Sequence, residues 1–320
     1  MRVMLLVDVE GVSQVDDVRA ASWNYPELYA QTQIDVTLDT NAAIRGLRAA
    51  GATEIIVADG HGARVRPHNF NLLPERLEPD VKLVRGASHL EAAKGLDALA
   101  MVGMHCRNGT PIGFMGHTTS GFTAVTFNGE WFGEVAMLAA VAGERGVPTI
   151  LVTGDDATIR ENHAFMPWIE TAVVKTATGR TSCDCLSGDV ARAQIETAAR
   201  CSLEQLASMK PLVVATPVET EVWFPSLYHA DLAEIIPGSR RVSETAIAQT
   251  SESFFDARRF FSTALRLASG VRASGLMKTL MDDPETAAGI IAHHRKEQED
   301  FWKAPPWITV ELPRQIAENG

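Results

Sequence analysis

Two carboxylates stand where the first apolar run of the chain ends. The residues MRVMLLV lead directly into D-V-E-G, so Asp8 and Glu10 lie one residue apart and precede Gly11. On a strand, Asp8 and Glu10 would point to the same side while Val9 points to the other, and the glycine would let the backbone turn tightly. Because carboxylates resist burial without a positive partner, this strand end requires a source of positive charge.

Acidic and imidazole side chains also follow other strand-like segments. His61 follows the apolar run TEIIVAD, His105 follows ALAMVGM, and Glu134 lies in a helical segment after an Asn-Gly turn. In open α/β sheets, ligands bind at the carboxyl ends of the strands, so we expect these groups to converge. Three carboxylates and two imidazoles can hold two divalent cations that share one carboxylate, and mixed nitrogen and oxygen donors suit zinc, or less selectively manganese and cobalt. The predicted ligands are Asp8, Glu10, His61, His105 and Glu134.

A glycine-flanked histidine lies between two of these ligands. The stretch P-I-G-F-M-G-H-T-T-S-G contains His117, with small hydroxyl residues after it. Such a loop could hold an imidazole over a metal centre as general base, general acid or nucleophile. The sequence is equally compatible with a surface loop that contains an incidental histidine.

The segments that position these residues alternate between strand and helix patterns. Continuous apolar runs, typical of strands covered on both faces, occur at 1–9, 53–59, 98–106 and 148–156. Helical spacing of apolar residues occurs at 26–51, 130–146 and 191–209. This alternation predicts an α/β fold, with a mainly parallel sheet flanked by helices.

The character of the sequence changes along the chain, which suggests a division into three parts. We predict a metal-binding α/β domain over residues 1–157, a second and smaller α/β subdomain over 158–269, and a polar, partly helical C-terminal extension over 270–320. Within the second part, residues 231–250 are predicted to form a strand pair or a loop.

The composition excludes several classes of partner. The formal net charge is -11 and no basic run is present, so we expect no binding to nucleic acid or to acidic membranes. No segment has the roughly 18 consecutive apolar residues of a membrane span, and the N-terminus does not have the pattern of a secretory signal, so we expect a cytoplasmic protein. The four cysteines are too few for a disulfide scaffold, and the C-D-C of Cys183 and Cys185 is too tight for the usual zinc spacing.

Taken in order, these motifs resemble a known family. The set DVEG, DGH, GMH, GHTTSG and NGEWFGE is similar to that of the D-aminopeptidase family of zinc metallopeptidases, peptidase family M55. The resemblance runs from residue 1 to about residue 269 and includes GVPTILVTGDD and IPGSR.

The resemblance implies a specific arrangement of the site. Asp8 would bridge two zinc ions, with Glu10 and His105 on one ion and His61 and Glu134 on the other. His117 matches the catalytic residue of the family. The implied reaction is cleavage of an amide bond beside a free amino terminus, with D-residues of short peptides preferred. The resemblance also implies a homo-oligomer, as a ring-shaped assembly such as a decamer, with active sites that face an inner channel.

The sequence departs from the family pattern in three places. Leu6 stands where the family usually has serine, the loop around His117 is slightly longer, and residues 270–320 exceed the family core. That extension contains His293, His294, Trp302 and Trp307. It could cap a channel, form an interface or reshape the substrate pocket, and we expect its two histidines on a solvated helix face.

Three other functions remain open from the sequence. An amidase or lactamase could use the same metal centre on a small non-peptide amide, because substrate pockets change more readily than metal ligands. A magnesium-dependent phosphohydrolase is disfavoured by the absence of a GxxxxGK[ST] motif and by histidine ligands. A protein that only stores metal would bind ions and hydrolyse no amide.

Overall fold

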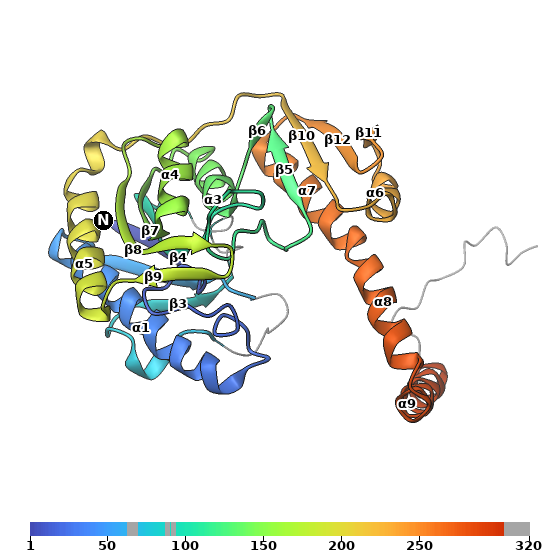
Figure 1. The fold of residues 1–320 in the computed structure, drawn as a ribbon. Coiled ribbons are helices and arrows are strands. Elements are labelled where there is room, and N and C mark those ends of the chain that lie inside the picture. Colours follow the sequence, from blue (N-terminus) through green and yellow to red (C-terminus); the bar gives the residue numbers. More distant parts are fainter. Residues whose placement is uncertain (63–69, 87–89, 91–93, 304–320) are drawn as a thin grey trace, which may run out of the picture. The chain divides into compact units, whose positions relative to one another are not determined.

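The computed structural model describes residues 1–62, 70–86, 90 and 94–303, and the chain divides into two compact units. The first unit is Met1–Ala268 and the second is Ser269–Gly320 (Figure 1). All of the predicted site residues belong to the first unit.

The first unit contains a seven-stranded, mainly parallel sheet with the strand order β3-β2-β1-β4-β7-β8-β9. Every neighbouring pair is parallel except β8 and β9, which are antiparallel. The strands are β1 (Arg2–Val7), β2 (Glu54–Asp59), β3 (Lys82–Arg85), β4 (Ala98–Met104), β7 (Thr149–Asp155), β8 (Glu170–Gly179) and β9 (Ser182–Cys185). The α/β fold with a mainly parallel sheet is therefore confirmed.

Helices cover both faces of this sheet, and the side chains of β1 show how. Val3, Leu5 and Val7 belong to one apolar cluster, which includes residues of α1 (Pro26–Ala49) and α5 (Gly188–Glu204). Met4 and Leu6 belong to a second cluster, which includes residues of α3 (Glu134–Gly143) and α4 (Asp156–Phe165). Because successive side chains point to opposite faces, a continuous apolar run buries both sides of the strand.

A second sheet of five antiparallel strands has the order β11-β12-β10-β5-β6. Its strands are β5 (Ala124–Phe127), β6 (Glu130–Trp131), β10 (Val218–Trp223), β11 (Arg240–Ser243) and β12 (Ala246–Ser251). The predicted Asn-Gly turn joins β5 to β6, with φ of 51° at Asn128 and 82° at Gly129. Helix α7 (Phe254–Ala268) packs on this sheet, because its aromatic residues share a cluster with Val222 and Ile247.

Both sheets draw strands from both sides of residue 157. Strands β5 and β6 precede it but lie in the second sheet, whereas β8 and β9 follow it but lie in the first. The division at this residue stays a prediction. Part of the segment predicted as a strand pair or loop is helical, because α6 (Leu227–Glu234) buries His229, Ala230 and Ala233 on one helical face before the β11–β12 hairpin begins.

The described part of the second unit contains two helices, α8 (Gly270–Met281) and α9 (Pro284–Lys303). His293 is exposed on α9, as expected, whereas Trp307 lies outside the described residues. Two short 3-10 helices, at Pro74–Arg76 and Leu206–Ser208, complete the described elements. Over the described residues, no helix combines the length and the apolar character that crossing a membrane requires.

Candidate metal centre

Two glycines let the ends of β1 and β4 approach each other. The backbone N–H of Asp8 donates to Val102 O over 2.9 Å, and that of Gly11 donates to Gly103 O over 2.9 Å. A Cβ at Gly103, where φ is +73°, would lie 2.3 Å from the carbonyl oxygen of Asp8, and one at Gly11 would lie 1.9 Å from Met104 O. Only residues without a Cβ allow this approach, which brings the D-V-E turn beside the residue after β4, His105.

The five predicted ligands lie together at the carboxyl ends of β1, β2 and β4 and at the first residue of α3. His61 Nδ1 is 3.2 Å from Asp8 Oδ1 and 3.3 Å from Glu10 Oε2. His105 Nε2 is 3.3 Å from Glu134 Oε1 and 3.8 Å from Asp8 Oδ2. Asp8 therefore stands between the two imidazoles, with one oxygen toward each.

The donor atoms of this group fit a divalent metal ion. Three sets of three side chains each have ligand atoms within 4.8 Å of one another: Asp8, Glu10 and His61; Asp8, His105 and Glu134; and Glu10, His105 and His117. Glu10 Oε2, His61 Nε2 and His105 Nε2 are buried and have no hydrogen-bond partner among the described residues. Buried polar atoms without partners are rare and costly, and carboxylate oxygen with imidazole nitrogen is a zinc-binding set.

In the absence of metal, protons must balance the charge of the buried acids. Burial, followed by the charge of Glu10, raises the pKa of Asp8 to about 7. Burial opposes charge on His105, but the Glu134 carboxylate, with help from Glu10 and Asp8, raises the pKa of that imidazole to about 10. Burial likewise opposes charge on Glu134, yet His105 lowers the pKa of this carboxyl to about 2. A proton thus occupies His105, the position at which a metal ion would replace it.

The 111–121 loop places His117 against the same group. The rings of His105 and His117 are stacked with centroids 3.9 Å apart, and His117 Nε2 is 3.8 Å from Glu10 Oε1. His117 Nδ1 contacts the carbonyl oxygen of Met115 over 2.7 Å, so this nitrogen carries the proton and Nε2 is the basic one. Burial, followed by the charge of His105, lowers the pKa of His117, so its imidazole is neutral.

The backbone of this loop is held in an uncommon conformation. Met115 and Thr119 have positive φ of 52° and 60°, although neither is glycine. The N–H of His117 donates to Cys106 O over 3.0 Å, and the N–H of Thr119 donates to Glu134 Oε1 over 2.7 Å. Left-handed backbone at residues with a Cβ is unfavourable and persists where surrounding contacts enforce it, often at functional sites.

A network that the sequence did not reveal supports His61. Asn71 Nδ2 donates to the carbonyl oxygen of His61 over 2.7 Å, and the N–H of Asn71 donates to Asp59 Oδ2 over 2.6 Å. The Tyr29 hydroxyl donates to the Asn71 side chain, and the Trp23 ring meets the His61 ring edge-on at 5.7 Å. Asp59, an acid at the end of β2, therefore positions the loop that follows β2 instead of joining the ligand group.

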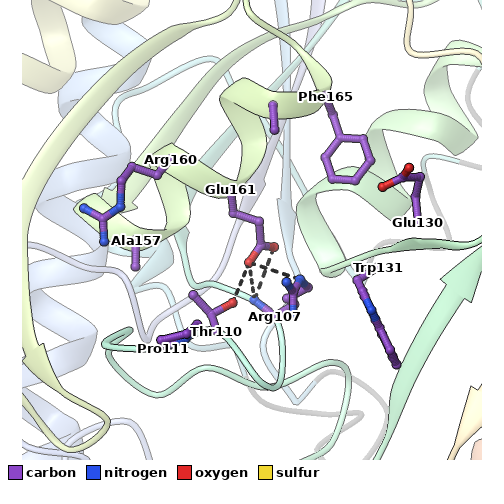
Figure 2. A pocket seen from close by; sticks show the side chains of 10 residues that line it. Arg107, Thr110, Pro111, Glu130, Trp131, Ala157, Arg160, Glu161 and Phe165 are labelled. Carbon is purple, nitrogen blue, oxygen red and sulfur yellow. Dashed lines mark hydrogen bonds and ion pairs between the residues drawn. The ribbon is translucent and has the colours of Figure 1, made fainter.

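Glu161 on α4 supports the segments that carry His105 and Glu134. Its carboxylate accepts hydrogen bonds from Arg107 N at 3.0 Å and from Thr110 Oγ1 at 2.8 Å (Figure 2). A Cβ at Gly133 would lie 2.5 Å from Glu161 Oε1. Sequence reasoning missed this residue because it lies inside an ordinary amphipathic helix.

Glu161 also lines a surface pocket of about 440 Å³, and none of the six predicted site residues does. Figure 2 shows its lining residues: Arg107, Thr110, Pro111, Glu130, Trp131, Ala157, Arg160, Glu161, Ala164 and Phe165. The pocket is therefore not the place where the acids and imidazoles meet.

Comparison with known proteins identifies the family of this chain. The family model for D-aminopeptidase, peptidase family M55, matches residues 1–263. The D-aminopeptidase of Bacillus subtilis (strain 168) is 28% identical over 258 residues, which cover 78% of this chain and 90% of that protein. The solved structure of the Zn-dependent D-aminopeptidase DppA from Bacillus subtilis, described as a self-compartmentalizing protease, matches with a TM-score of 0.76 and 25% identity over 84% of this chain and 98% of that one. The chain belongs to the D-aminopeptidase family, peptidase family M55.

Proposed function

We propose that this protein is a metal-dependent aminopeptidase that hydrolyses the amide bond next to a free amino terminus, with D-residues of short peptides as its substrates. The observation that carries the proposal is the convergence of three carboxylates and two imidazoles, three of whose buried ligand atoms make no hydrogen bond with a described residue. Membership of the D-aminopeptidase family supports the reaction class.

Two divalent ions, most suitably zinc, would be held by the five predicted ligands. Asp8 is the shared ligand in this proposal, because its two oxygens face His61 and His105 separately. When bound, such ions act as Lewis acids toward a carbonyl oxygen and lower the pKa of water toward neutrality.

His117 would move the proton that the reaction requires. Its Nε2 is basic and faces the ligand group, while the contact of Nδ1 with Met115 O fixes the tautomer and the ring orientation. A neutral imidazole at this position can accept a proton from the attacking water and donate it to the departing amine. A proton shuttle is a simpler role than nucleophile, because water already serves as the nucleophile.

A substrate panel tests the function and separates it from the amidase alternative. The zinc-loaded protein is assayed against D-dipeptides, D-aminoacyl anilides, their L-counterparts and simple amides without an α-amino group. We expect hydrolysis of the D-series and little of the others. Hydrolysis confined to amides that lack a free amino terminus would contradict the aminopeptidase proposal and favour the amidase.

We also propose a cytoplasmic homo-oligomer in the form of a ring, such as a decamer. The support is the similar protein DppA, which is described as self-compartmentalizing. Sedimentation equilibrium measures the mass of the assembly, and a monomer at micromolar concentration would contradict the ring.

A further inference from the structure

Strand β9, at the edge of the seven-stranded sheet, carries two thiols on one side. Cys183 and Cys185 are half-buried, whereas the alternate residues Ser182 and Asp184 are exposed. The two sulfur atoms lie 3.9 Å apart and are not joined by a disulfide bond. The proposed function uses neither of them.

The surroundings favour a thiolate at one of the two sulfurs. The hydrogen bond between the two sulfur atoms lowers the pKa of Cys185 to about 7. Burial opposes this shift, and the positive charge of Lys175 adds to it. Lys175 is opposite Cys185 in the β8–β9 register and is only 1% exposed. Cys183 Sγ lies 3.8 Å from the carbonyl oxygen of Val15. A half-exposed thiol with a lowered pKa beside a cation is a reactive thiol.

We propose that Cys183 and Cys185 form a redox-active dithiol that a small-molecule disulfide, such as oxidised glutathione, converts reversibly into an intramolecular disulfide. The Cys185 thiolate attacks one sulfur of the oxidant, which forms a mixed disulfide and expels one thiolate. Cys183 then loses its proton and attacks the sulfur of Cys185, which expels the second thiolate. The protein loses two electrons and two protons, and the oxidant gains both and leaves as two thiols.

The spacing of the pair makes this disulfide labile. Two residues of strand span about 6.4–6.8 Å between Cα atoms, which lies at the upper end of the range found for disulfides. The sulfur atoms must also move from 3.9 Å to about 2.05 Å. A strained and accessible disulfide is readily reduced, which suits a reversible modification.

Trypsin separates the relevant cysteines for measurement. Cleavage after Arg180 and Arg192 gives a peptide of residues 181–192 that contains both Cys183 and Cys185. Cys201 lies on peptide 201–240, because Pro211 prevents cleavage after Lys210. The folded, zinc-loaded protein is equilibrated with reduced and oxidised glutathione at several ratios, quenched in acid, alkylated and analysed by mass spectrometry. We expect peptide 181–192 to lose both alkylation sites and to be lighter than its reduced form by two hydrogen atoms, at ratios that leave peptide 201–240 alkylated.

Matched variants and reduction complete the test. The variants Cys183→Ser and Cys185→Ser should each abolish the intramolecular form, Cys201→Ser should not, and dithiothreitol should restore both alkylation sites. The proposal is overturned if peptide 181–192 stays fully alkylated in excess oxidised glutathione, or if it accumulates only as a glutathione adduct.

Discussion

Asp8 contacts both imidazoles of the ligand group, and this position explains its burial. One of its oxygens is 3.2 Å from His61 and the other 3.8 Å from His105, while the side chain beside it, Glu10, adds a second negative charge. Two acids at the end of a buried strand repel each other and lose hydration, so the fold tolerates them only with cations between them.

Loss of the His117 imidazole should separate chemistry from metal binding. We expect His117→Ala to retain metal and to lower turnover by about 10²–10⁴-fold, the usual contribution of a general acid–base residue. Metal content by elemental analysis and turnover of a D-aminoacyl anilide are measured together, with His163→Ala, an exposed histidine on α4, as the matched control. Near-normal turnover at full metal content would remove His117 from the mechanism.

Because His105 is protonated in the metal-free protein, we expect the stability of that protein to depend on pH. The pKa of His105 is raised from 6.5 to about 10, so its contribution to stability is complete below about pH 6.5 and is lost as pH rises toward 10. The raised pKa of Asp8 acts in the same direction, because ionising this buried acid between about pH 4 and 7 destabilises the fold. We therefore expect the Tm of metal-free protein to fall between pH 6 and 9.

Zinc should remove most of this dependence, because it replaces the proton on His105. Calorimetric titration with zinc in buffers of different ionisation enthalpy should show proton release near pH 7. Zinc binding without proton release, or a metal-free Tm that rises over this range, would contradict the assignment of charges in the site.

At the scale of elements, the site depends on the close approach between the C-terminal ends of β1 and β4. Glycine at position 103 serves two purposes, because its φ is +73° and its missing Cβ leaves space for Asp8 O. Gly129, at the β5–β6 turn, has a similar φ of +82°, but a Cβ there would meet no described atom within 4 Å.

The variants Gly103→Ala and Gly129→Ala therefore separate backbone strain from close contact. Both should lose about 1 kcal/mol or more of stability from the positive φ, but only Gly103→Ala should displace Asp8 and lower zinc affinity. Chemical denaturation and competition with a chelator measure the two effects. Equal zinc affinity in both variants would show that the approach of β4 does not position Asp8.

At the scale of the whole molecule, the ligand group and both sheets lie within Met1–Ala268. The match to DppA covers 98% of that chain but 84% of this one, so the extra length resembles an addition to a complete family fold. We expect a chain that ends at Ala268 to bind as much zinc as the full chain and to unfold cooperatively.

Zinc content and thermal unfolding of the two chains, measured side by side, test this expectation. A shortened chain that is soluble but binds no zinc would show that residues 269–320 are needed to build the site. Comparison of the sedimentation of both chains shows whether the extension contributes to assembly.

Much of the fold could be predicted because its signals are local. Buried parallel strands are apolar on both faces, and helices repeat every 3.6 residues, so MRVMLLV, TEIIVAD and ALAMVGM indicated strands. Their order predicted that Asp8, His61 and His105 would lie together at the carboxyl ends of these strands. The ordered motifs also indicated the family that the comparison shows. The candidate metal ligands could therefore be chosen from residue type and from position relative to the strand ends.

Only the tertiary structure decided which distant segments meet. The pairing of β5 with β10, the hydrogen bonds of Asp59 to Asn71, and the contact of Glu161 with the segment after His105 join residues far apart in the chain. The same is true of Cys185 and Lys175, which a strand pairing brings together. Local periodicity indicates which face of a helix or strand is buried. Which segment packs against that face depends on the whole chain, so a short sequence pattern does not predict it.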